Sequence, residues 1–225
     1  MYKMKKVFKF IKIGIYLIAL GAFIILIIGA FNVNPPKEYC ELLWNDKLIS
    51  VYENDPESFR VYYLSEYEKN YSSEDGKFSF CKVRCIEAAQ QWQITVICND
   101  STVRDLGEKI GRKLSSDKEN FTFVLKDQDG NIYSEYDYIY THEKRHGFRR
   151  LVFDGIPRNS VSKLSLCIYY TGDIQNGSLP AKPFVTLSVF NSDLTKKNYL
   201  EDDAKHPPKE KTVFMHHDKL SEGTK

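Results

Sequence analysis

The sequence lacks a strong net charge, a dominant residue type and the short motifs of common enzyme families. Its 225 residues carry a formal net charge of only +2, with 12 Gly, 8 Pro and 42% hydrophobic residues. These values exclude a collagen-like repeat, a disordered chain and a strongly basic nucleic-acid binder. G-x-S-x-G, P-loop and Gly-rich dinucleotide motifs are all missing. We expect one domain of about 150 to 190 residues with short appendages, no cofactor and no nucleic-acid partner.

Charge is absent from one long stretch near the N-terminus. Residues 13–31, IGIYLIALGAFIILIIGAF, are 19 consecutive uncharged residues. As a helix they would span roughly 28 Å, which matches the hydrocarbon core of a bilayer. Five basic residues and no acidic one precede this run: Lys3, Lys5, Lys6, Lys9 and Lys12. Because positive charge stays on the cytoplasmic side, we predict a cytoplasmic segment over 1–12, a transmembrane helix over 13–31 in the lipid bilayer, and an extracytoplasmic C-terminal domain.

A cleaved signal peptide is the alternative to this single-pass anchor. Signal peptides have an apolar region of about 7 to 15 residues, followed by small residues at the cleavage site. The run here is longer, and Ile28 stands where a small residue is needed. The uncleaved anchor in the cell membrane is therefore favoured.

Prolines and charged residues mark the limits of the domain. Pro35-Pro36 prevents the helix from continuing, so residues 32–37 are predicted to form a stem. Residues 38–195 are predicted to be the folded ectodomain. Residues 196–225 are polar and charged and are predicted to form a flexible tail, in which the adjacent His216 and His217 are solvated. Docking of Val213, Phe214 and Met215 on the domain is the alternative for part of this tail.

Alternating apolar and polar residues predict a hairpin between residues 78 and 99. The expected register pairs Cys81 with Cys98, Val83 with Val96 and Cys85 with Ile94 on one apolar face. The opposite face then carries Lys82, Arg84, Gln93 and Thr95 and is predicted to face water. On this basis Val96→Asp should destabilise the domain severely, and Thr95→Asp should cost little.

The remaining pattern predicts a mainly β fold. Further strands are expected at about residues 59–64, 121–126, 131–140, 148–153, 164–170 and 184–190. Residues 38–58 fit either a helix or a strand. One short helix is expected from the spacing of Val103, Leu106, Ile110 and Leu114, with Asp100 and Ser101 as candidate caps and with Gly107 and Gly111 weakening it. About eight short strands and one helix indicate an antiparallel β-sandwich of Ig-like type, preceded by one N-terminal transmembrane helix.

This layout resembles the membrane-anchored, Ig-like or telokin-like ectodomains of bacterial cell surfaces. The segments that carry the resemblance lie between residues 92 and 173 and read WQITVICNDSTVRDLG, FTFVLKDQDGNIYS, RRLVFDGIP and KLSLCIYYTGD. The resemblance concerns the fold and includes no diagnostic motif. It implies display outside the cytoplasm but no particular activity.

The five cysteines leave two interpretations open. An odd number means that at least one thiol is unpaired or bonds to another molecule. Cys81 and Cys85 are too far apart along one strand to form a disulfide with each other, since about 13 Å would separate their Cα atoms. A bridge between Cys81 and Cys98 is geometrically feasible. The alternative is that these cysteines are small buried residues.

Residues 142–146, His-Glu-Lys-Arg-His, match the H-E-x-x-H motif of zincin peptidases. On a helix, this resemblance implies His142 and His146 as zinc ligands and Glu143 as the general base. The preceding residues 136–141 alternate as a strand, and Gly147 suits a hairpin turn. A solvated β-turn is therefore the favoured interpretation, and a helix at residues 138–148 would support the enzyme.

Two other groups of residues are candidate sites. Asp127, Asp129 and Asn131 begin like an EF-hand loop, but Ile132 and Tyr138 stand where the turn glycine and the bidentate glutamate belong, so an Asp-Gly hairpin is favoured. Exposed tyrosines are good contact residues for sugars or proteins. The candidate binding surface is Tyr133, Tyr136, Tyr138 and Tyr140.

The sequence thus leads to two functional hypotheses. The favoured one is a single-pass surface protein whose β-sandwich binds a protein or glycan ligand or serves as an accessory envelope module. The alternative is a membrane-anchored zinc-dependent hydrolase that uses the HEKRH segment.

Overall fold

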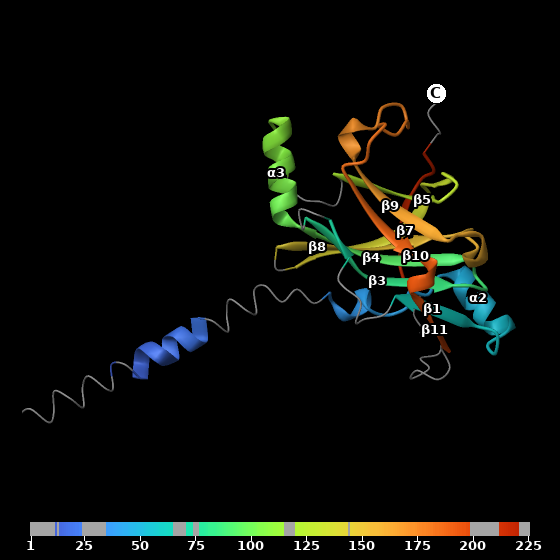
Figure 1. The fold of residues 1–225 in the computed structure, drawn as a ribbon, viewed down its shortest axis with the longest axis horizontal. Helices are drawn as coiled ribbons and strands as arrows, with labels where there is room; N and C mark the ends of the chain where they lie inside the picture. Colours follow the sequence, from blue (N-terminus) through green and yellow to red (C-terminus); the bar gives the residue numbers. More distant parts are fainter. Residues whose placement is uncertain are drawn as a thin grey trace, which may run out of the picture. The chain divides into compact units, whose positions relative to one another are not determined.

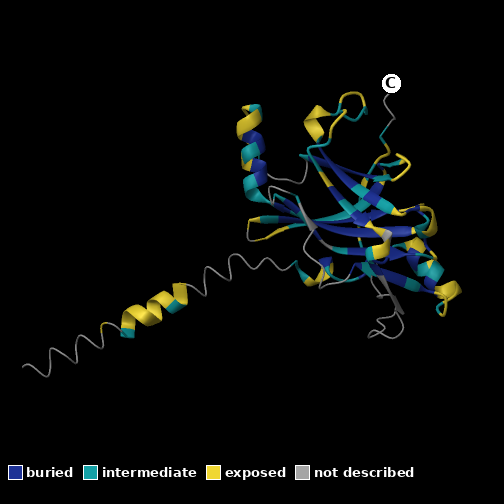
Figure 2. Ribbon diagram, in the orientation of Figure 1, coloured by how far each residue is buried: buried dark blue, intermediate teal, exposed yellow. Residues whose placement is uncertain are grey.

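The computed structural model describes residues 12, 14–23, 35–64, 71–73, 77–114, 120–143, 145–198 and 212–220. The chain divides into two compact units, Met1–Asn34 and Pro35–Lys225. In the first unit, residues 12 and 14–23 are helical, and large apolar side chains such as Leu17 and Ile18 are exposed (Figure 2). Within the described ranges, no helix has both the length and the apolar character needed to cross a membrane. Residues 13 and 24–31 of the predicted span lie outside those ranges.

The second unit is mainly β and contains two antiparallel sheets (Figure 1). The larger sheet has the strand order β11 (Leu194–Asn198), β1 (Arg60–Leu64), β3 (Phe78–Ile86), β4 (Gln91–Asn99), β8 (His146–Phe153), β7 (Tyr136–Glu143) and β12 (Met215–His217), and β2 (Tyr71–Ser72) also pairs with β3. The smaller sheet has the order β10 (Val185–Phe190), β9 (Lys163–Tyr170), β5 (Phe121–Asp127) and β6 (Ile132–Tyr133). The mainly β prediction is therefore confirmed, but the described residues form twelve strands where about eight were expected.

Two α-helices lie at opposite ends of the larger sheet (Figure 1). Helix α2 (Asp46–Asn54) resolves the ambiguity of residues 38–58, because the Asn45 side chain accepts a hydrogen bond from the Leu48 amide at 2.9 Å and starts the helix there. Helix α3 (Asp100–Ile110) is the predicted amphipathic helix, but its cap is Asn99 and not Asp100 or Ser101. Short 3-10 helices are η1 (Lys37–Tyr39), η2 (Arg158–Ser160), η3 (Thr171–Asp173) and η4 (Asn191–Asp193).

The main core lies between the two sheets and includes the predicted hairpin. Trp92 is 1% exposed in this core, and its indole N–H donates to the Ile156 carbonyl at 3.1 Å. Strands β3 and β4 form the hairpin, but a bulge between Phe80 and Lys82 shifts the register, so Val83 lies opposite Ile94 and Phe78 lies opposite Cys98. The expected pairs of Cys81 with Cys98, Val83 with Val96 and Cys85 with Ile94 are therefore all wrong, and Cys98 is a free thiol.

The opposite face of this hairpin is covered and does not face water. Arg84, Gln93 and Thr95 are buried beneath residues 39–44, which we call the strap. The Gln93 side chain accepts from the Leu43 amide at 3.0 Å and donates to the Leu43 carbonyl at 2.8 Å. Thr95 donates to the Tyr39 carbonyl at 2.8 Å. The predicted wet face is wrong because its polar side chains satisfy the buried backbone of the strap. The expectation that Thr95→Asp costs little is wrong for the same reason, since Thr95 is fully buried.

A second apolar cluster fixes the strap and α2 on the same side of the sheet. Trp44 stacks on Phe59 with ring centroids 5.7 Å apart, and Tyr52 of α2 meets Phe59 edge-on at 5.2 Å. Leu48 and Val61 are fully buried in this cluster. Residues 38–58 thus form an integral layer of the domain.

The C-terminal segment is partly folded onto the sheets, so the prediction of a flexible tail over 196–225 fails for its described parts. Strand β11 extends to Asn198, and β12 pairs with β7, with His217 opposite Tyr136. The His217 ring stacks on the Tyr136 ring at 4.7 Å, and His216 Nδ1 lies 2.7 Å from Asp137 Oδ1. Neither histidine is simply solvated. Residues 199–211 and 221–225 of the predicted tail lie outside the described residues.

We expect the pairing of β12 with β7 to weaken at high pH because of His216 and at low pH because of His217. The hydrogen bond to Asp137 raises the pKa of His216. The stabilisation from this bond is therefore complete below about pH 6.5 and is lost as the pH rises through the raised pKa. Burial lowers the pKa of His217, so docking weakens as pH falls below about 6.5 towards that lowered value.

NMR titration of the two imidazole rings measures these pKa values directly. His216→Gln should remove the alkaline loss of docking, and His217→Phe, which keeps a stacking ring, should remove the acidic loss. Identical titration of both rings near pH 6.5 would contradict the assigned contacts.

Candidate functional site

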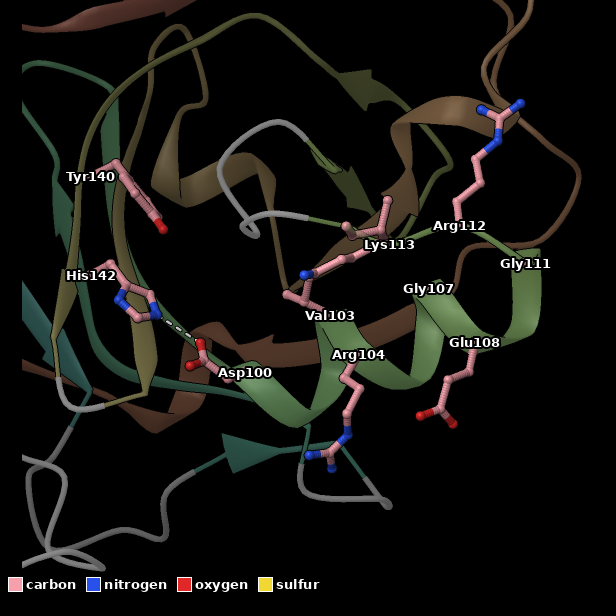
Figure 3. A pocket seen from close by; sticks show the side chains of 11 residues that line it. Asp100, Val103, Arg104, Gly107, Glu108, Gly111, Arg112, Lys113, Tyr140 and His142 are labelled. Atoms are coloured by element: carbon pink, nitrogen blue, oxygen red, sulfur yellow. Dashed lines mark hydrogen bonds and ion pairs between the residues drawn. The ribbon is translucent and has the colours of Figure 1, made fainter.

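An open groove of about 810 Å³ lies between α3 and β7 (Figure 3). Helix α3 contributes Val103 and Gly107 to its wall, and the chain that follows the helix contributes Leu114. Strand β7 contributes Tyr140 and His142 from the other side. The groove therefore joins segments that are about 40 residues apart in the sequence.

Two glycines shape this groove. Gly111 has a φ of +66° and ends α3 in the left-handed conformation, which glycine adopts without strain. The Arg112 amide then donates to the Gly107 carbonyl at 2.9 Å, and a Cβ on Gly107 would lie 2.5 Å from the Arg112 carbonyl oxygen. Glycine at position 107 thus lets residues 112–114 fold back across the helix and reach the groove.

One hydrogen-bonded pair connects the two walls. His142 Nε2 lies 2.6 Å from Asp100 Oδ1, at the first turn of α3 (Figure 3). The Asp100 amide also donates to the Arg145 carbonyl at 3.0 Å. These contacts fix the end of the β7–β8 hairpin against the start of α3, and they engage the Asp100 carboxylate.

The charged side chains at the groove point in different directions. Figure 3 shows the ammonium end of Lys113 directed into the groove, whereas the ends of Arg104, Glu108 and Arg112 point away from it. Arg104 Nε lies 3.9 Å from Asp105. Lys113 has no hydrogen bond or ion pair with any residue in the described part of the chain.

The predicted tyrosine surface is divided between the core and the groove. Tyr136 is 3% exposed and belongs to the core, so it offers no contact surface, and burial raises its pKa to about 12. Tyr133 is half-buried and donates to Asp127 Oδ2 at 3.2 Å. Tyr138 and Tyr140 are half-buried, with the guanidinium of the buried Arg149 lying 5.3 and 5.4 Å from their ring centroids. Of the four predicted tyrosines, Tyr140 is the one that lines the groove.

The HEKRH segment is a hairpin. His142 and Glu143 end β7, His146 begins β8, and Glu143 lies opposite His146. Because neighbouring residues of a strand face opposite sides, His142 reaches Asp100 while His146 contacts Asn99 on the other side, with Nε2 3.4 Å from Asn99 Nδ2. The two imidazoles cannot share a metal in this arrangement. Among the described residues, no group of three or more His, Cys, Asp or Glu side chains is arranged to hold a metal ion.

Alanine substitution at His142, Glu143 and His146 is expected to leave the fold almost unchanged. His142→Ala removes a half-exposed hydrogen bond to Asp100, and the loss of such an exposed contact costs about 0.2 to 1 kcal/mol. Zinc content and thermal unfolding of the full chain, with and without a chelator, test this expectation. Stoichiometric zinc in the unmodified protein that is lost in His142→Ala would support the zinc-hydrolase hypothesis.

The acidic loop at Asp127 is the predicted Asp-Gly hairpin. Asp127 Oδ1 accepts hydrogen bonds from the Asp129 and Asn131 amides at 2.9 Å, and Oδ2 accepts from the Asn131 side chain at 2.7 Å. Desolvation raises the pKa of Asp127, but these hydrogen bonds together outweigh it and the pKa is lowered overall. The carboxylate is engaged within the turn that joins β5 and β6, and this arrangement is not that of a calcium loop.

The groove is not predicted by any pattern in the sequence. The sequence predicts Asp100 as a helix cap, Val103 as part of the apolar stripe and Gly107 as a residue that weakens the helix. The available signal was the pair of glycines four residues apart in one amphipathic helix, followed directly by Arg112 and Lys113.

Comparisons of the chain with protein-family models, curated proteins and solved structures find no match.

Proposed function

We propose that the chain is a single-pass surface protein, anchored by residues 13–31, whose two-sheet domain binds a ligand outside the cytoplasm. The lysine-flanked run of 19 uncharged residues supports the anchor and its orientation. The helical residues 14–23 expose Ile15, Leu17, Ile18 and Phe23, which a lipid bilayer would cover.

The Ig-like, telokin-like character of the domain is part of the same proposal. Two antiparallel sheets share one apolar core, and Trp92 is buried between them, as expected for a β-sandwich of this type. The strap and α2 are additions to that arrangement.

The groove between α3 and β7 is the observation that carries the binding function. A void between the two sheets, lined by Trp92 and other apolar residues, measures only about 10 Å³, which is about the size of one water molecule. The groove measures about 810 Å³ and combines apolar side chains with a few polar groups, as small-molecule sites usually do.

The anchor is tested on intact cells. The protein should fractionate with membranes, and external protease should remove the residues that follow Pro36. Full protection of the domain, or a mature protein that begins near Phe31, would contradict the anchor.

The groove is tested by direct binding of a neutral aromatic probe. Equilibrium dialysis of 2-naphthylmethanol against the full chain in phosphatidylcholine nanodiscs, with empty nanodiscs as the blank, should detect binding. Tyr140→Ala should weaken it at least about 5-fold because it removes an aromatic wall. Tyr133→Ala, another half-buried tyrosine away from the groove, is the matched control and should have little effect. Equal effects of both variants would reject the groove as the binding site.

A further inference from the structure

We propose that the groove between α3 and β7 takes an amphiphilic anion, a small ligand with an apolar body and one carboxylate-type group near Lys113. This inference rests on the proposed binding function and adds the chemical class of the ligand. It is carried by the directions of the charged side chains around an apolar wall.

The apolar body of the ligand has a suitable surface. Val103 is 7% exposed and Leu114 is half-buried, and both pack against the main core while lining the groove. The half-buried Tyr140 ring provides an aromatic wall opposite the helix. Gly107 is buried, and the backbone of residues 112–114 covers it and brings Leu114 to the groove wall beside Val103.

The charge directed into the groove is positive. Lys113 points inward (Figure 3) and has no ion pair or hydrogen bond with the described residues. The Asp100 carboxylate, which could oppose an anion, accepts the short contact from His142 at 2.6 Å. The Glu108 carboxylate points away from the groove. Among the described residues, an anionic group would therefore meet one unpaired ammonium and no competing inward carboxylate.

Lys113 follows the C-terminus of α3, where the helix dipole favours any positive charge. The experiment must therefore distinguish stabilisation of the helix by Lys113 from binding of a ligand. Arg112 precedes Lys113 and also follows the C-terminus of α3, and it likewise makes no ion pair with the described residues, but its side chain points away from the groove (Figure 3). Arg112→Gln is therefore the matched control for Lys113→Gln. Both variants should melt within a few degrees of the unmodified protein.

The test uses three probes that share one aromatic body. These are 2-naphthoate, 2-naphthylmethanol and 2-naphthylmethylammonium, each dialysed against the full chain in phosphatidylcholine nanodiscs with empty nanodiscs as the blank. We expect 2-naphthoate to bind about 10-fold more tightly than the neutral probe, and the ammonium probe to bind more weakly than either. Added salt should weaken the binding of 2-naphthoate most.

The variants distinguish the outcomes. Lys113→Gln should reduce 2-naphthoate binding to the level of 2-naphthylmethanol, and Arg112→Gln should change it less than about 2-fold. If all three probes bind equally and Tyr140→Ala weakens all of them, the groove binds ligands but the anionic class is wrong. Unchanged binding of 2-naphthoate in Lys113→Gln would likewise show that the anionic class is wrong. If no probe binds in a Tyr140-dependent way, the proposed binding function fails together with the inference.

Discussion

Replacing Thr95 by lysine is expected to unfold the domain. Thr95 is fully buried, its hydroxyl donates to the Tyr39 carbonyl, and it accepts from the Arg150 guanidinium at 2.6 Å. A lysine would add a second cation beside Arg150 and displace the strap, which we expect to cost more than about 4 kcal/mol. Val96→Asp, on the core face of the same strand, should be equally severe because it buries an unpaired carboxylate.

Thermal unfolding followed by tryptophan fluorescence measures these losses in the full chain. Thr186→Lys is the matched control, because Thr186 is exposed on strand β10, and it should change the free energy of unfolding by less than about 0.5 kcal/mol. If Thr95→Lys were as mild as Thr186→Lys, the outer face of the hairpin would be solvated and the strap would be misplaced.

Gln93→Leu is expected to detach the strap and cost about 2 to 4 kcal/mol. The Gln93 side chain bonds to both the amide and the carbonyl of Leu43, donates to Gln91 at 2.8 Å and accepts from Arg150 at 3.2 Å. Leucine fills a similar volume but leaves these buried groups without partners. Hydrogen exchange at the Leu43 amide should therefore accelerate together with the loss of stability.

A second glutamine provides the control for this prediction. Gln128 also bonds to backbone groups, accepting from the Ser162 amide and donating to the Ser160 carbonyl, but it is exposed. Water replaces these bonds in Gln128→Leu, so the loss should stay below about 1 kcal/mol. Equal losses at the two positions would mean that Gln93 is not sealed beneath the strap.

Local patterns predicted the central strands well. The alternation around Val83, Ile94 and Val96 identified the β3–β4 hairpin, and Asp129-Gly130 identified the β5–β6 turn. These features depend on neighbours along the chain. Short edge strands such as β12 were not predicted, because three residues with two histidines carry no alternation signal and are ordered by contacts with Tyr136 and Asp137.

Polar residues misled the prediction of exposure. Arg84, Gln93 and Thr95 alternate along their strands as the residues of a solvent-exposed face do. The same alternation occurs when polar side chains bind the buried backbone of another segment, here the strap. The Arg84 side chain donates to the Cys40 carbonyl, which a single sequence does not reveal. The bulge after Phe80 also changed the register without any glycine or proline to mark it.

The candidate site was the least predictable part because it is built from tertiary contacts. The HEKRH segment has the spacing of a zinc helix, but the strand pattern before it correctly favoured a turn. The groove depends on the reversal at Gly111, the close approach at Gly107 and the contact between Asp100 and His142. None of these is a pattern of residues along the chain.

Photolabelling tests the central claim, that the groove between α3 and β7 is the ligand site, most directly. The full chain in phosphatidylcholine nanodiscs would be irradiated with 4-benzoylbenzoate, an aromatic carboxylate, and the labelled peptides mapped by mass spectrometry. Labelling should concentrate in residues 100–114 and 138–143, and both 2-naphthoate and the Lys113→Gln substitution should suppress it. Labelling centred on the strap or on residues 212–220, or labelling that 2-naphthoate does not suppress, would contradict the claim.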